Sequence, residues 1–208
     1  MGAIHAHHGL IMAAGASLPT VTWNPSDKAS EITLSAGNLT ATYGTVTGAY
    51  RSVRATHGKS SGKHYFEIRF DQITNGAAYS LFGVCTSAHS MSSGHIADNA
   101  NGWAYYQETG AKVTNAVQTA YGATYTAADV IGVAVDMDAG KIWFAKNNTW
   151  QASGNPAAGT SEAFSGLSGT LFPAVSLYRN SVDPIVTGRF KSSDFSYSPP
   201  AGFSPWES

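Results

Sequence analysis

Charged side chains are scarce in this chain: Lys, Arg, Asp and Glu together make up 12% of its 208 residues. Soluble domains usually carry about 25–35% charged residues at their surfaces. Part of this surface is therefore expected to contact other protein. The formal net charge is −1, and the Lys and Arg residues are scattered. Because no basic stretch is present, the sequence predicts neither nucleic-acid binding nor attachment to an anionic membrane.

Cysteine is almost absent as well. The single residue of this type, Cys85, ends the apolar stretch 80–85 and has no partner for an internal disulfide. A free cysteine in such a stretch usually behaves as a small buried hydrophobe. We therefore expect a core thiol and not a nucleophile, which would need an activating environment that the sequence does not indicate.

Long apolar runs and amphipathic helices of more than about two turns are missing too. What the chain contains instead is a series of short alternating runs separated by turn residues, which predicts an all-β, antiparallel sandwich. In the run 63–70, for example, Phe66, Ile68 and Phe70 are expected to face inward. The stretch Asn24 to Asp27 is expected to be a turn between strands. Residues 86–101 are expected to form a long irregular loop, which in a compact domain is usually functional or mobile.

The stretch 129–150 predicts the hairpin around which the domain is organised. Ile131, Val133 and Val135 are expected on one face of the first strand. Gly140 closes the turn, and Ile142 and Phe144 of the second strand lie on that same face. On the other face, Trp143 lies across from the small residues Gly132 and Ala134. This pattern indicates cross-strand packing or a covered outer surface.

Residues 1–20 differ from the rest, because they are small, apolar and rich in His, with no charged side chain. A secretory signal would need a basic start, and a membrane span would need a longer apolar run. We therefore predict an N-terminal assembly arm over residues 1–20 that docks on other proteins or on copies of the chain, followed by one domain over residues 21–208. His5, His7 and His8 can hold a metal only where copies meet around an axis, and we assign no metal because no carboxylate or Cys accompanies them.

No set of residues in the chain has the spacing of a catalytic or cofactor site, so we assign neither catalytic residues nor a cofactor. Asp136 and Asp138 are interpreted as residues that cap the backbone N–H groups of a turn. This interpretation is preferred to a Ca²⁺ site and to a carboxylate pair that acts on a glycoside. Glu67 and Asp71 lie along one strand and its end, and do not by themselves form the paired carboxylates of a glycan hydrolase. The stretch 58–63 lacks the spacing of a phosphate-binding loop and is expected to be a turn.

Five segments, taken in order, resemble the SPRY family. They are Gly62-Lys-His-Tyr-Phe-Glu-Ile68, Gly102-Trp103, Asp129-Val-Ile-Gly-Val-Ala-Val-Asp136, Gly140-Lys-Ile-Trp-Phe144 with Asn147, and Leu171-Phe-Pro-Ala-Val-Ser-Leu177. The resemblance implies a bent antiparallel β-sandwich of the concanavalin-like jelly-roll type. It also implies a binding module and not an enzyme.

Three further segments are similar to SPRY-bearing proteins encoded by bacteriophages and prophages. They are residues 21–25, 38–42 and 197–203. This likeness implies a virion component, assembled in the host cytoplasm, that serves as a tail appendage, a fibre or a capsid decoration. The alternatives are a lectin-like carbohydrate-binding protein for host attachment and, less favoured, a glycan hydrolase on a related sandwich.

In family members that bind peptides, loops at one end of the sandwich form the contact surface. Carried onto this chain, the resemblance places a ligand-binding site at the loop before Gly102, at the loop after Leu177, and beside the strand around residue 53. The site residues implied are Arg51, Arg54, His95, Asn99, Asn101, Tyr178, Arg179 and Asn180. Arg179 stands where peptide binders often have an aromatic residue, and this leaves open whether the ligand is a peptide or a glycan.

Deleting residues 1–18 tests the arm. We expect the truncated chain to remain a folded monomer and to lose assembly, because the change in composition near Val21 marks the start of the domain. Circular dichroism and sedimentation velocity measure the two properties. A truncated chain that assembles as the full chain does would rule out the arm.

Overall fold

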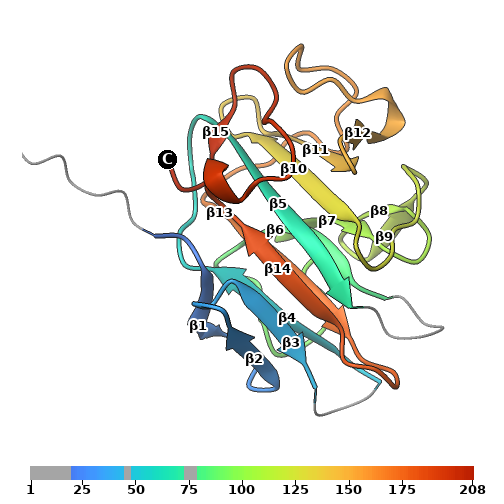
Figure 1. Ribbon diagram of the computed structural model, residues 1–208. Coiled ribbons are helices and arrows are strands. Elements are labelled where there is room, and N and C mark those ends of the chain that lie inside the picture. The colour runs from blue at the N-terminus through green and yellow to red at the C-terminus, as the bar shows by residue number, and fades with distance from the viewer. Residues whose placement is uncertain (1–19, 45–47, 73–78) are drawn as a thin grey trace, which may run out of the picture.

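The computed structural model describes residues 20–44, 48–72 and 79–208. Two antiparallel sheets face each other and form the predicted sandwich (Figure 1). The only helical elements in these residues are two single turns, η1 (Gln151–Ser153) and η2 (Ser192–Asp194). None of the described helices has the length and apolarity to cross a membrane. Most of residues 1–20, with His5, His7 and His8, lies outside the described ranges, so the assembly arm stays a prediction.

The first sheet, sheet A, has seven strands in the order β1-β4-β13-β6-β7-β8-β9. Their bounds are β1 (Trp23–Lys28), β4 (Tyr50–Ala55), β6 (Leu81–Thr86), β7 (Gly102–Tyr106), β8 (Lys112–Thr114), β9 (Val117–Thr119) and β13 (Leu171–Tyr178).

The second sheet, sheet B, follows the order β12-β11-β10-β5-β14-β3-β2, with β15 pairing parallel to β5. Its strands are β2 (Ile32–Ser35), β3 (Thr40–Tyr43), β5 (Lys63–Gln72), β10 (Val130–Asp136), β11 (Lys141–Lys146), β12 (Thr149–Trp150), β14 (Ile185–Arg189) and β15 (Ser204–Pro205).

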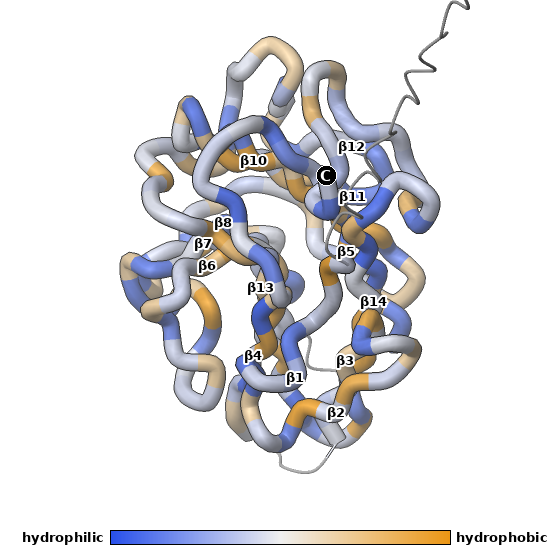
Figure 2. The backbone as a smooth tube through the Cα atoms, turned by 90° about the vertical axis from the view of Figure 1, so that its left-hand side faces the viewer, coloured by the Kyte–Doolittle hydropathy of each residue, from blue (hydrophilic) through white to orange (hydrophobic). Residues whose placement is uncertain are grey.

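The main core lies between the two sheets. Figure 2 shows the layers from the side, with β4, β13, β6 and β7 in one and β5, β14 and β3 in the other. Phe66, Ile68 and Phe70 point inward from β5 as predicted, and all three are fully buried in this core. Phe70 meets Phe82 of β6 edge to face, with ring centroids 5.4 Å apart. Alternate side chains of facing strands therefore fill the interior.

The organising hairpin forms as predicted. β10 and β11 pair so that Trp143 lies opposite Ala134, and Gly140 closes the turn at a φ of +61°. Trp143 is fully buried in a second apolar cluster on the outer face of sheet B, with Tyr65 and Phe203. Its indole Nε1 donates to the carbonyl of Thr160 at 2.8 Å. The covered outer surface expected from the small residues opposite Trp143 is therefore present.

Glu67 holds the C-terminal segment over this outer cluster. Its carboxylate is fully buried and accepts hydrogen bonds from the backbone N–H groups of Ser196 and Tyr197 at 2.7 and 2.9 Å. Tyr65 Oη also donates to it at 3.1 Å, and Arg189 pairs with it at 3.2 Å. Both oxygens are occupied, so Glu67 has a structural role and is not accessible to a glycan.

The prediction of a turn from Asn24 to Asp27 is wrong. These residues lie within β1, whose pairing with β4 is irregular between Trp23 and Lys28. Asn24 still makes a local turn contact, since its Oδ1 accepts from the Ser26 N–H at 2.9 Å. β1 is the edge of sheet A, where a strand tolerates Pro25 and a bulge because its outer N–H groups need no partner strand.

Glu67→Ala is expected to lower the free energy of unfolding by about 3–5 kcal/mol, because it leaves Arg189 and three other donors without their acceptor. Chemical denaturation measures the change. Glu162→Ala serves as the control: this side chain pairs with Lys141 at the surface, where such a pair contributes less than about 1 kcal/mol. Equal losses in the two variants would contradict the role of Glu67.

Candidate functional site

Residues 87–101 cover the outer face of sheet A. The Ser52 N–H donates to the Met91 carbonyl at 3.1 Å, and the Ile96 N–H donates to Ser176 Oγ at 2.8 Å. Met91, Ile96 and Ala97 are buried in an apolar cluster with residues of β6, β7, β8 and β13. The segment is irregular, as predicted, and it is packed against sheet A.

Arg54 of β4 fixes the start of this cover. Its side chain is almost fully buried and pairs with Asp27 at 2.6 Å. The guanidinium also donates to the carbonyls of Thr86, Ser87 and His89, the last two at 3.4 and 3.3 Å. Because its donors are used in this way, Arg54 is not available to a ligand. It is a positioning residue for the cover.

Four half-buried rings gather on the outer face of sheet A, and we call Tyr50, Tyr79, His95 and Tyr178 the aromatic patch. Tyr50 and Tyr178 are direct partners in the pairing of β4 with β13, with ring centroids 5.1 Å apart. His95 from the cover meets Tyr50 at 5.2 Å, and Tyr79 meets Tyr178 at 4.9 Å. Elements far apart in sequence therefore build one continuous aromatic surface.

Two carboxylates flank the patch. Tyr106 lies beside Tyr50, and its hydroxyl donates to Glu108 at 2.7 Å. Asp98 interacts electrostatically with His95, and its Oδ1 lies 3.6 Å from His89 Nδ1. Burial raises the pKa of Tyr50 to about 12 and lowers the pKa of His95. Tyr50 and His95 are therefore uncharged in neutral solution.

Asn99 and Asn101 belong to the interior of the cover. Asn99 Nδ2 donates to Asp98 Oδ1 at 2.9 Å and lies 3.3 Å from His89 Nδ1. Asn99 Oδ1 in turn accepts from the Asn101 N–H at 2.9 Å. These contacts shape the end of the cover and join Asn99 to Asp98, which lies beside His95.

Arg51 and Arg179 lie next in sequence to Tyr50 and Tyr178, and each is in an ion pair. Arg51 Nε is 2.5 Å from Glu31, and Arg179 Nε is 2.5 Å from Asp183. Both guanidinium groups interact electrostatically with Tyr43, and so does Tyr178. Asn180 is exposed in the loop that follows β13. The structure therefore brings His95 and Tyr178 together. Arg51 is the register partner of the core residue Leu177, so it points to the face of sheet A opposite to the patch. Arg179 and Asn180 follow the end of β13.

Tyr50 and Tyr79 are not among the residues that the sequence predicted for the site. Each precedes or begins a strand, and their meeting depends on the strand order β4-β13-β6. An aromatic residue one position before the predicted Arg51 is a weak signal by itself. Only the pairing of β4 with β13 shows that it lies next to Tyr178.

Comparison with known proteins identifies the family. The SPRY domain family matches residues 63–189. The chain belongs to the SPRY family. It is 29% identical to Ran-binding protein 9 of Xenopus tropicalis over 184 residues, which is 85% of the chain and 31% of that protein. The chain thus spans about a third of that curated relative.

The fold of this SPRY domain is similar to that of the crystal structure of the SPRY domain of human HERC1. The TM-score is 0.65 at 19% identity, covering 80% of this chain and 96% of the other. At this identity the likeness supports the fold alone. The SPRY sandwich inferred from the five sequence segments is confirmed.

The other candidate chemistry of this SPRY domain was also located. Cys85 is buried, and burial raises the pKa of its thiol to about 11, as expected for a core thiol. Among the described residues no three His, Cys, Asp or Glu side chains come close enough to hold a metal. Trp143 is buried, while Trp150 is half-buried against Tyr65.

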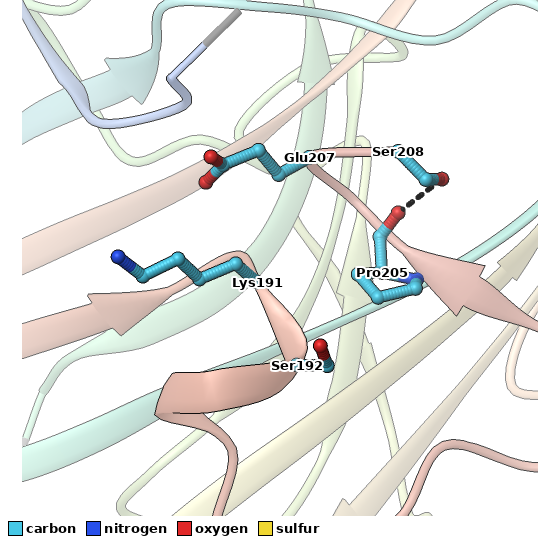
Figure 3. Close-up of a pocket in the computed structure, with 5 residues that line it drawn as sticks. All are labelled: Lys191, Ser192, Pro205, Glu207 and Ser208. Atoms are coloured by element: carbon cyan, nitrogen blue, oxygen red, sulfur yellow. Dashed lines mark hydrogen bonds between the residues drawn. The ribbon is translucent and has the colours of Figure 1, made fainter. Parts of the chain in front are cut away.

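A small hollow lies beside β15, on the sheet opposite to the patch. Lys191, Ser192, Pro205, Glu207 and Ser208 line it, and the Ser208 hydroxyl donates to the Pro205 carbonyl (Figure 3). Figure 3 shows the Lys191 and Glu207 side chains on the same side of this hollow. One cation and one anion lining a shallow hollow do not indicate a particular ligand, so the patch is the better candidate site.

Arg179→Ala is expected to weaken ligand binding and to leave the melting temperature within about 1 °C, because its ion pair with Asp183 is at the surface. Differential scanning calorimetry and titration of a bound peptide measure the two quantities. Unchanged affinity would show that the loop containing Arg179 is not part of the site.

Proposed function

We propose that this SPRY domain is a non-enzymatic protein-binding module and that its aromatic patch contacts a segment of the partner. The observation that carries this proposal is the meeting of Tyr50, Tyr79, His95 and Tyr178 on one outer face. Tyr is among the residue types that most often dominate binding energy at protein interfaces. Arg54 and the buried hydroxyl pair of Ser52 and Ser176, 2.7 Å apart, support the patch from below. A fixed support reduces the entropy lost on binding.

The comparison with the frog protein supports a protein partner. Its name describes a protein that binds Ran, and 85% of the present chain aligns with part of it. The proposal takes from this only the kind of partner, a protein.

A finer version of the proposal places the domain in a bacteriophage virion, as a tail appendage, a fibre or a capsid decoration. It is supported by the low charge of 12% and by the uncharged residues 1–20. Immunogold labelling of purified particles, with antibody raised against residues 21–208, tests this location. Particles without label would remove the virion role and leave the binding module in place.

The lectin alternative also places its ligand on the patch. The half-buried tyrosines can stack on a sugar ring, and Asp98 can accept hydrogen bonds from the sugar hydroxyl groups. A glycan array separates the two kinds of ligand. Binding to a defined glycan that Tyr178→Ala abolishes would favour the lectin over the protein-binding module.

Selection from a displayed library of random peptides tests the module directly. We expect enriched peptides whose affinity falls at least about tenfold with Tyr178→Ala, because truncating an aromatic anchor commonly costs 2 kcal/mol or more. Tyr197→Ala is the matched control, since this half-buried Tyr lies in the C-terminal segment over sheet B. Peptides bound equally by both variants, or no enrichment, would contradict the proposed site.

A further inference from the structure

We propose that the aromatic patch accepts a cationic side chain of the partner, arginine by preference, and this inference rests on the proposed function. The orientation of the rings, the charges around them and the ion pairs of the nearby arginines all favour a cation.

The rings of the patch meet at steep angles. The interplanar angle is 62° between Tyr50 and Tyr178, 77° between Tyr50 and His95, and 78° between Tyr79 and Tyr178. Neighbouring π faces therefore point in different directions and form corners, not one flat plane. A cation is attracted to the face of an aromatic ring within about 6 Å of its centre. Corners of this kind offer it more than one face.

The charges beside the rings are negative. Glu108 acts on Tyr50, and in the described part of the chain it has a hydrogen bond from Tyr106 but no ion pair with Lys or Arg. Asp98 lies beside His95, and its ion-pair partner is His89. Burial lowers the pKa of His89, so this imidazole is neutral at pH 7 and leaves the charge of Asp98 uncompensated. Two carboxylates thus complement an incoming cation.

The nearest arginines do not reverse this field. Arg51, Arg54 and Arg179 each have a carboxylate partner within 2.6 Å. An acidic partner segment would have to compete with these existing pairs, whereas a cationic one meets Glu108 and Asp98, neither of which pairs with a Lys or Arg in the described residues. Arginine is favoured over lysine because its planar guanidinium stacks on rings and is more weakly hydrated.

Peptides selected on the full chain supply the test. We expect a recurring Arg whose replacement by citrulline, a neutral group of the same shape, weakens binding about fivefold to tenfold. Lys at that position is expected to bind with intermediate affinity. Glu108→Gln should weaken the Arg peptide by about twofold to threefold and leave the citrulline peptide unchanged. Glu207→Gln, which removes the same charge beside β15, should affect neither.

A pH series gives a second readout. The groups that face His95 are Tyr50 of β4, Asp98 and His89 of the cover, and, beyond Tyr50, Tyr178, Tyr106 and Glu108. The pKa of His95 is lowered from its ordinary value of 6.5, so its protonation begins below that pH. Protonated His95 repels a bound cation. The Arg peptide should therefore lose more affinity than the citrulline peptide as the pH is lowered below 6.5.

The outcomes separate the inference from the function on which it rests. Selected peptides that depend on Tyr178 but contain no Arg or Lys, or that bind equally well with citrulline, would overturn the cationic ligand and leave the binding module standing. Peptides insensitive to Tyr178→Ala would overturn both. Arg peptides that respond to citrulline and to Glu108→Gln, with unchanged binding in Glu207→Gln, would establish the inference.

Discussion

The buried guanidinium of Arg54 is the interaction on which the binding face depends. It pairs with Asp27 on the edge strand β1, donates to carbonyls of residues 86, 87 and 89, and lies 5.6 Å from the ring centre of Phe172. A buried charge is costly unless its donors are satisfied. The protein satisfies them with the backbone that begins the cover of sheet A. The position of His95 next to Tyr50 follows from this attachment together with the Ile96 and Ser176 contact.

Both outer faces of the sandwich are covered, and this changes the meaning of the low charge. Residues 87–101 bury apolar side chains on sheet A, and the C-terminal segment held by Glu67 buries Trp143 and Tyr65 on sheet B. A sandwich usually exposes polar residues on its outer faces. Here part of the surface that would carry charge belongs to two additional small cores. The 12% of charged residues therefore partly reflects this construction.

The hairpin of β10 and β11 was predictable because alternation fixes which side chains face inward, and Trp143 opposite Ala134 indicated the covered outer face. The cover over sheet A was not predictable. It is attached through single polar contacts, such as that of the Ile96 N–H with Ser176, and these leave no periodic pattern in the sequence. Arg54 was expected to bind the ligand because of the family resemblance, whereas its actual partners, Asp27 and the carbonyls of residues 86, 87 and 89, are far from it in the sequence. Tyr79 escaped because strand order brings it to Tyr178, and sequence does not give strand order.

Nuclear Overhauser contacts between the rings of His95 and Tyr50 test the central claim most directly, measured in the native chain and in Arg54→Met. The account predicts strong contacts in the native protein. It predicts their loss in the variant, while the core contact between Phe66 and Trp206, whose ring centroids are 5.3 Å apart, persists as a sign of intact folding. Contacts between His95 and Tyr50 that remain at full strength in Arg54→Met would contradict the claim that this guanidinium builds the binding face.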